Sequence, residues 1–222
     1  MTATSRRGSA AGFWDRVWMD PANQGYWRRA SPPLVALAHM QSPLERPDVL
    51  DLGCGLGRNS VVFARQGFRV TAVDVSPAAV AQVRACTREL GLEVRTAVAS
   101  FLDDAFPPES FDMVLAVNVL YHAHGHEFAR ALGHVRGWLR PGGLLYLTCP
   151  SLEDVVHNPA RQVGPDTWEL EPGHVHCCFG LEDLRERLAG FRLTSVERCE
   201  HHRDDGTRHR ISSRWRIHAE KA

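Results

Sequence analysis

The sequence predicts an α/β fold with a mostly parallel sheet whose last strand runs antiparallel to its neighbour. Strand-like and helix-like runs alternate through residues 49–149, and right-handed crossovers between such runs give a parallel sheet. Residues 191–202 and 208–219 then alternate in polarity on either side of Asp204-Asp205-Gly206, which indicates a hairpin. The final strand is therefore expected to run against the parallel set.

Local signals define each element in turn. Gly67 ends one helix, Ser76-Pro77 begins the next, and Pro141-Gly142-Gly143 stops a third. Pro21 and Pro32-Pro33 interrupt a Trp-rich helical region near the start. Strands are expected at 49–53, 69–75, 93–99, 111–120 and 144–149, and helices within 13–40 and at 59–66, 77–90, 127–139 and 181–189.

The length of 222 residues fits one domain with a sizeable core. We expect residues 1–12 to form a flexible arm and residues 13–222 to form a single domain. Within it, residues 13–45 should be an N-terminal helical cap. Residues 151–180 are rich in glycine, proline and polar residues and lack a period, so they are predicted to be a lid or substrate loop.

Composition excludes several classes of protein. The formal net charge is zero, which argues against a nucleic-acid binder. No apolar run reaches the roughly 18 residues of a membrane span, and no apolar core follows the arginines of the N-terminus as in a secretory signal. Six scattered cysteines favour free thiols in a reducing cytoplasm. We expect a cytoplasmic monomer or homodimer that acts on a small molecule without contacting nucleic acid or membrane.

The stretch from Val49 to Pro77 carries three closely spaced glycines, Gly53, Gly55 and Gly57, after a predicted strand. Glycines at such a place let the backbone turn sharply and approach a ligand closely. The spacing does not fit the dinucleotide motif G-x-G-x-x-G, because its third glycine would fall at Arg58 or at Ser60.

Two carboxylates flank this loop. Asp51 precedes the turn, where it suits a cationic group better than a phosphate, and Asp74 ends the second strand, where such folds bind a ribose diol. A ligand with a ribose, a positive charge and no phosphate fits both acids. S-adenosylmethionine, with its ammonium and sulfonium, is such a ligand.

Three motifs resemble one known family. DLGCGLGRNS resembles the D-x-G-x-G-x-G motif of class I S-adenosylmethionine-dependent methyltransferases, ESFDMVLAVNVLYH resembles their fourth strand and its exit, and LRPGGLLYLT their fifth strand. The similarity spans about residues 49–149, and its three motifs in order make it specific. Gly-Arg-Asn after the loop is loosely similar to the tellurite-resistance branch and its small-molecule relatives. The family implies a Rossmann-like seven-stranded sheet with helices on both faces.

The resemblance also implies a set of cofactor-binding residues. Asp51 would act on the cofactor's ammonium, Asp74 on its ribose and Val75 on its adenine. The family often has an acid at the position of Ser100, which Asp103 could replace. The complete implied set is Asp51, Gly53, Cys54, Gly55, Gly57, Asn59, Asp74, Val75, Ser100, Phe101 and Asn118.

Two histidine clusters stand out among twelve histidines. The run HAHGH holds His122, His124 and His126, and GHVHCCF holds His174, His176, Cys177 and Cys178. His122, His174 and His176 are the candidate catalytic residues, because a neutral imidazole can accept a proton near neutral pH. No metal is assigned, although His174, His176 and Cys178 would share one side of an extended segment and could bind zinc or a soft metalloid.

The sequence therefore predicts a methyltransferase that moves a methyl group from S-adenosylmethionine to an oxygen, nitrogen or sulfur atom of a small molecule. Methyl transfer is an in-line displacement that mainly requires alignment and exclusion of water. A base is needed only for an acceptor that arrives protonated. Two alternatives stay open: a thiol or metalloid methyltransferase, and a non-catalytic cofactor-binding regulatory protein.

Overall fold

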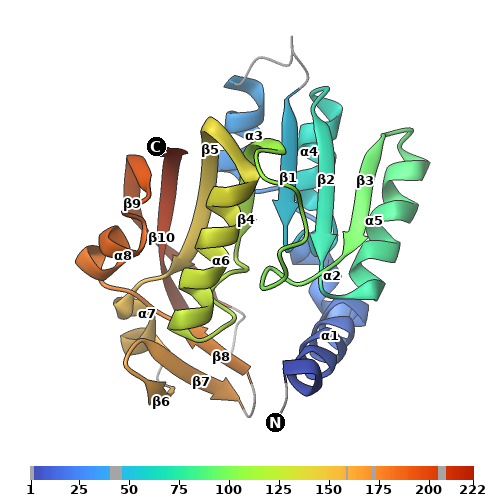
Figure 1. The fold of residues 1–222 in the computed structure, drawn as a ribbon. Helices are drawn as coiled ribbons and strands as arrows, with labels where there is room; N and C mark the ends of the chain where they lie inside the picture. The colour runs from blue at the N-terminus through green and yellow to red at the C-terminus, as the bar shows by residue number, and fades with distance from the viewer. Residues whose placement is uncertain (1–2, 41–46, 159, 172–173, 205–208) are drawn as a thin grey trace. The chain divides into compact units, whose positions relative to one another are not determined.

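The computed structural model describes residues 3–40, 47–158, 160–171, 174–204 and 209–222 (Figure 1). Among these residues, no helix combines the length and the apolar character that crossing a bilayer demands. The helices are α1 (Ala3–Met19), α2 (Pro21–Trp27), α3 (Pro32–Met40), α4 (Arg58–Arg65), α5 (Pro77–Glu89), α6 (Gly125–Trp138), α7 (Leu152–His157) and α8 (Leu181–Arg187). The strands are β1 (Asp48–Leu52), β2 (Arg69–Asp74), β3 (Val94–Val98), β4 (Phe111–Val117), β5 (Leu139–Pro150), β6 (Arg161–Gly164), β7 (Thr167–Glu171), β8 (His174–Cys177), β9 (Phe191–Asp204) and β10 (His209–Lys221).

The main sheet has seven strands in the order β3-β2-β1-β4-β5-β10-β9. β1 pairs with β2 and β2 with β3 in parallel, whereas β10 is antiparallel both to β5 and to β9. The predicted fold class, including the antiparallel last strand, is therefore confirmed. The turn residues 205–208 of the predicted hairpin lie outside the described residues.

The chain divides into two compact units: residues up to 105 together with 110–115, and residues 106–109 together with 116–222. In the first unit, α1 runs beside α5 (Figure 1). The Asp15 carboxylate of α1 accepts hydrogen bonds from the Ser76 hydroxyl at 2.5 Å and from the Ala78 backbone N–H at 3.1 Å. Asp15 thus ties α1 to the N-terminus of α5, whose first N–H groups have no partner within the helix.

Local sequence explains why α5 begins at Pro77. Ser76 has an extended backbone at the N-cap, and its hydroxyl accepts a hydrogen bond from the Ala79 N–H at 3.0 Å. Proline at the first helical position loses no hydrogen bond, because that N–H would have no helical partner. The helix therefore starts directly after the end of β2 and leaves Asp74 beside its N-terminus.

In the second unit, the hairpin of β9 and β10 extends the sheet, and α6 buries one apolar face. The buried residues of α6 recur at helical spacing: Phe128, Ala131, Leu132, Val135 and Trp138. The indole N–H of Trp215 on β10 donates to the Phe179 carbonyl at 2.8 Å, so the segment after β8 is attached to the main sheet. These contacts hold the loop that carries the histidines described below.

The flexible arm expected at residues 1–12 stays a prediction, although α1 begins at Ala3 within its described part. No proline interrupts residues 3–19, so the helix predicted from residue 13 continues toward the N-terminus. The helical cap itself breaks into α1, α2 and α3 at Pro21 and Pro32, as those prolines predict. Residues 41–46, at the end of the predicted cap, lie outside the described residues.

The predicted aperiodic loop at residues 151–180 is instead largely folded. It contains α7 and a three-stranded antiparallel sheet in the order β6-β7-β8, in which Trp168 pairs with His176 and Glu169 with Val175. The alternation of polar and apolar residues on either side of residues 172–173 is too short to indicate strands from the sequence alone. A lid function for this segment stays a prediction, as does the single domain over residues 13–222.

Candidate functional site

The glycine loop joins β1 to α4 in the first unit. Gly53, Gly55 and Gly57 have φ angles of 69°, 51° and 78°, which lie in the left-handed region. Glycine adopts that region without the steric penalty that a Cβ atom causes. The loop conformation therefore requires glycine at all three predicted positions.

Two of these glycines also permit close packing within the chain. A Cβ atom at Gly55 would lie 2.9 Å from the ring of Trp18, and one at Gly57 would lie 2.9 Å from the side chain of Val83. The close approach to Gly55, which the sequence assigns to a ligand, is thus made by a tryptophan of α1. Trp18 packs there with Leu56 as part of a buried apolar cluster.

Asp51, at the end of β1, is buried, and its Oδ2 accepts a hydrogen bond from the Ser60 hydroxyl at 2.5 Å. Burial raises the pKa of this carboxyl to about 6, although the Ser60 hydrogen bonds and the charge of Arg58 lower it. A buried carboxylate with a raised pKa gains from a cation bound beside it. The site therefore suits the cofactor's ammonium group.

Asp74, at the end of β2, is the second buried acid. Its Oδ2 accepts from the Gly55 N–H and its Oδ1 from the Ser76 N–H, both at 2.9 Å. Burial raises the pKa of Asp74, and these backbone bonds lower it. The Val75 backbone also bonds this carboxylate, and because a carboxylate has about four acceptor sites, one remains for a hydroxyl of a ribose.

Two buried polar atoms near this loop have no hydrogen-bond partner among the described residues: Oδ1 of Asn59 and Nε1 of Trp18. Unpaired buried polar groups are uncommon and often mark a place for a ligand or water. Asn59 is one of the predicted cofactor residues, at the second position of α4. An amino-acid-bearing cofactor can supply both the donor and the acceptor that these atoms lack, so the residues present fit S-adenosylmethionine.

The turn after β3 holds Ser100 and Phe101. Asp103 accepts a hydrogen bond from the Ser100 N–H at 3.1 Å, and the Ala99 N–H donates to the Asp74 carbonyl at 3.1 Å. The turn therefore carries an acid three residues beyond the position where the family often has one. Val75, half-buried, follows Asp74 in the same unit.

Asn118 follows β4 and belongs to the second unit. Its φ angle is 54°, which is uncommon for a residue with a side chain and is often found at functional sites. Its backbone N–H donates to the Thr148 hydroxyl at 2.9 Å, and its Oδ1 accepts from that hydroxyl at 3.1 Å and from Arg214 at 3.3 Å. Asn118 is thus held firmly at the carboxyl end of its strand.

The three predicted catalytic histidines form one cluster in the second unit. Nδ1 of His122 lies 3.1 Å from Nε2 of His174, and Nε2 of His176 lies 3.2 Å from the same atom. Sequence reasoning selected them from two separate motifs. The structure brings them together because β8 bonds to the segment after β4, where the Cys177 N–H donates to the Tyr121 carbonyl at 2.9 Å.

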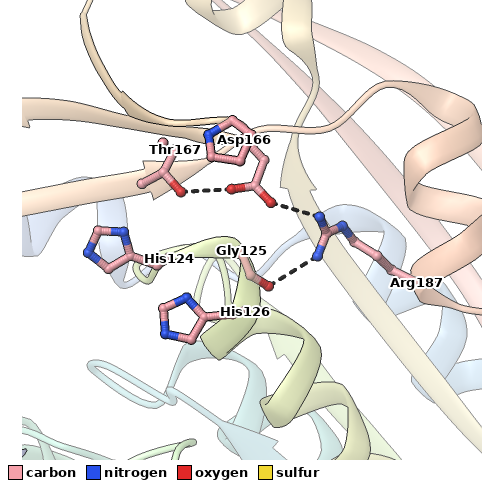
Figure 2. Close-up of a pocket in the computed structure, with 8 residues that line it drawn as sticks. His124, Gly125, His126, Asp166, Thr167 and Arg187 are labelled. Carbon is pink, nitrogen blue, oxygen red and sulfur yellow. Dashed lines mark hydrogen bonds and ion pairs between the residues drawn. The ribbon is translucent and has the colours of Figure 1, made fainter.

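The other two histidines of HAHGH lie elsewhere. Figure 2 shows His124 and His126 at a separate pocket at the start of α6, with Asp166 and Arg187. Arg187 donates to the Gly125 carbonyl at 3.1 Å and to Asp166 Oδ2 at 2.7 Å. The Arg187 guanidinium therefore links α8 to the start of α6 and to Asp166.

Burial keeps the histidine cluster neutral. It lowers the pKa of His176 to about 3 and that of His122 well below its usual value, and the neighbouring histidines and Arg214 lower both further. Burial also lowers the pKa of His174, whereas a hydrogen bond to Glu171 raises it. At neutral pH all three imidazoles present unprotonated nitrogens.

The neighbouring cysteines do not join the cluster. Cys177 and Cys178 are buried, and burial raises the pKa of the Cys178 thiol to about 12 and that of Cys177 well above its usual value. Since the thiolate is the metal ligand and nucleophile, these thiols are poorly suited to either role. Cys54 in the glycine loop is likewise buried with a raised pKa, which agrees with a small packing residue.

Two residues of this region were missed by sequence reasoning. Arg214 on β10 is half-buried in the second unit, and its guanidinium donates to the Tyr121 hydroxyl at 2.6 Å and lies 5.0 Å from the centre of that ring. No motif links an alternating strand near the end of the chain to a tyrosine after β4. Only the pairing of β10 with β5 brings them together.

Comparisons with known proteins agree with this geometry. Residues 49–143 match the family model described as a methyltransferase domain. The ubiquinone biosynthesis O-methyltransferase of Xylella fastidiosa is 31% identical over 134 residues, which cover 59% of this chain and 53% of that protein. The chain thus spans about half the length of the curated relatives it matches.

Two solved structures show the same fold. The 1,6-didemethyltoxoflavin-N1-methyltransferase of Burkholderia thailandensis, with 1,6-didemethyltoxoflavin and S-adenosylhomocysteine bound, has a TM-score of 0.74 at 22% identity and covers 100% of this chain and 91% of that one. TehB from Haemophilus influenzae has a TM-score of 0.67 at 17% identity and covers 86% of this chain and 62% of that one.

The seven-stranded sheet and the glycine loop are those of the class I methyltransferase fold, and residues 49–143 match the methyltransferase-domain model. Residues 49–143 carry the matched methyltransferase domain, and the solved 1,6-didemethyltoxoflavin-N1-methyltransferase of the same fold has S-adenosylhomocysteine bound. The resemblance inferred from three sequence motifs is thereby confirmed.

Proposed function

We propose that this chain transfers the methyl group of S-adenosylmethionine to a hydroxyl oxygen of a small molecule. The observation that carries the proposal is the pair of buried acids, Asp51 and Asp74, at the ends of neighbouring parallel strands around a left-handed glycine loop. Ligands of open parallel sheets bind beyond these strand ends. The curated O-methyltransferase relatives support oxygen as the acceptor atom.

The residues of the two units have distinct proposed roles. In the first unit, Asp51 would hold the cofactor's ammonium and Asp74 its ribose hydroxyls, with the predicted glycines beneath the bound cofactor. In the second unit, the histidine cluster would assist removal of the acceptor's proton. A hydroxyl acceptor requires such assistance because its pKa lies well above neutral pH, whereas the methyl donor is already activated.

The proposal predicts both binding and turnover. Calorimetry should show binding of S-adenosylmethionine and S-adenosylhomocysteine but not of NADH. With radiolabelled donor and a panel of phenols, amines and thiols, label should appear in phenolic acceptors. Binding of NADH without S-adenosylmethionine would contradict the cofactor, and label confined to amines or thiols would contradict the acceptor atom.

Asp74→Ala should weaken the binding of S-adenosylhomocysteine by about 1–3 kcal/mol, the scale of hydrogen bonds to a charged group. The loss should be read by calorimetry alongside the melting temperature, because Asp74 also bonds the Gly55 and Ser76 N–H groups. Asp74→Asn is the matched variant, since it keeps one acceptor oxygen. Unchanged affinity in both variants would place the ribose elsewhere.

The thiol or metalloid alternative is not favoured by the structure. That alternative depends on Cys177 and Cys178 as ligands or nucleophiles. Their raised thiol pKa values leave almost no thiolate at neutral pH. A regulatory protein without catalysis would still bind the cofactor, so the label-transfer experiment separates it from the enzyme proposed here.

A further inference from the structure

We propose that His122, His174 and His176 form a three-histidine site for a divalent transition metal of the Zn²⁺ type. The site lies wholly within the second unit and uses the histidines proposed to assist proton removal, but metal binding there does not require methyl transfer to occur. Imidazole nitrogen is a ligand that zinc, copper, iron and nickel share.

The distances between the ring nitrogens match such a site. His174 Nε2 lies 3.1 Å from His122 Nδ1 and 3.2 Å from His176 Nε2, and one ligand atom from each residue lies within 4.8 Å of the others. Zinc binds histidine nitrogen at about 2.0–2.1 Å with tetrahedral angles, which places neighbouring ligand nitrogens about 3.3 Å apart. The two nitrogen–nitrogen distances, from His174 to His122 and from His174 to His176, are already close to that length.

Hydrogen bonding alone does not explain the cluster. Nε2 of His174 faces a ring nitrogen of both other histidines. An imidazole nitrogen carries either one proton or one lone pair, so it can make only one well-directed hydrogen bond. A metal ion at the centre would instead be approached by three lone pairs, one from each ring.

Two of the rings have polar partners of the kind that metal-binding histidines have. Nδ1 of His174 lies 3.4 Å from a carboxylate oxygen of Glu171, and the ring of His122 hydrogen-bonds the backbone of Asn118. Metal-binding histidines almost always give their second ring N–H to a carboxylate or a backbone carbonyl, which orients the ring and fixes its tautomer. With Nδ1 of His174 bonded to Glu171, its Nε2 is the nitrogen that faces the other two histidines.

The surroundings of the cluster carry charges of both signs. The positive charge of Arg214 opposes a bound cation, whereas the Glu171 carboxylate beside His174 favours it. The His174 side chain is 17% exposed, which leaves a route to solvent. Three ligands also leave a fourth position open, as in catalytic zinc sites.

The test uses the full chain without an affinity tag, freed of metal with a chelator. Co²⁺ is titrated first, because its visible absorption reports ligand number and geometry, and Zn²⁺ is then added in competition. We expect one equivalent per chain with the spectrum of a four-coordinate site. His122→Ala and His174→Ala should each lower the affinity at least about 100-fold, more than the loss of an outer partner.

His126→Ala is the matched control, because His126 belongs to the same HAHGH run but lies at the pocket of Figure 2. It should bind Co²⁺ like the parent. Glu171→Gln keeps all three ligands and should weaken binding roughly 10- to 100-fold. Glutamine has nearly the same shape as glutamate, so this variant should fold like the parent. Circular dichroism checks the folding of every variant.

The proposal is overturned if the parent binds no Co²⁺ or Zn²⁺ above the level of His174→Ala, or if His126→Ala loses as much affinity as the cluster variants. Calorimetry with S-adenosylhomocysteine on the same metal-free preparation separates the two proposals. Metal binding without S-adenosylhomocysteine binding would remove the proposed function and keep this site.

Discussion

Asp51→Asn should raise the stability of the free protein at neutral pH and at the same time weaken its binding of S-adenosylmethionine. Burial raises the pKa of the Asp51 carboxyl from 3.8 to about 6, so its ionised form costs folding free energy at pH 7. A shift of this size corresponds to about 3 kcal/mol. Asparagine removes the charge and keeps an oxygen that can accept from Ser60.

The pH dependence follows from the same shift. Between the unfolded pKa of 3.8 and the folded value of about 6, the native state binds more protons at Asp51 than the unfolded state does. Stability from this group therefore falls as the pH rises through that window, and the cost is complete above it. In Asp51→Asn this fall in the free energy of unfolding should disappear. The difference in stability between the variant and the parent should therefore be largest near pH 7.

Urea unfolding at pH 4, 5, 6 and 7 measures the effect, and calorimetry with S-adenosylmethionine measures the loss of binding. The lost charge partner of the ammonium should cost roughly 10- to 150-fold in affinity, equivalent to about 1.5–3 kcal/mol. Glu93→Gln, at an exposed carboxylate of the same unit, is the control. Equal stability and equal affinity in parent and Asp51→Asn would show that this acid neither bears the burial cost nor holds the cofactor.

The cofactor half of the site was predictable because its signals are local. Gly53, Gly55 and Gly57 lie in one loop, and Ser76-Pro77 fixes where α5 begins, so Asp74 is placed by residues next to it. Trp18 was not placed by any such signal. Its contact with Gly55 depends on how α1 packs, which a helical pattern alone does not determine.

The histidine cluster was predictable in its members but not in its assembly. His122 and His174 are 52 residues apart in the chain, and their contact depends on the small sheet that β6, β7 and β8 form. The segment was assigned to a loop because its strands are only four or five residues long. Strands that short carry too few alternations to distinguish from irregular polar sequence.

His174→Ala should lower turnover of a hydroxyl acceptor by roughly 10²–10⁴-fold, the usual scale for a lost proton-transfer group. Affinity for S-adenosylhomocysteine should stay near that of the parent, because the residues proposed to hold it, Asp51 and Asp74, belong to the other unit. His126→Ala, outside the cluster, should retain turnover. Activity within a few-fold of the parent in His174→Ala would remove the cluster from the reaction.

Comparison of the three cluster variants shows how the histidines act. A direct base would be His174, because its side chain is partly exposed and Glu171 opposes the lowering of its pKa by burial, whereas His176, with a pKa of about 3, is too weak a base for neutral pH. In that case His176→Ala should lose much less turnover than His174→Ala, and chelators should have no effect. If the three histidines act by holding a metal that lowers the pKa of the acceptor hydroxyl, all three variants should lose turnover equally, and chelator should reproduce the loss in the parent.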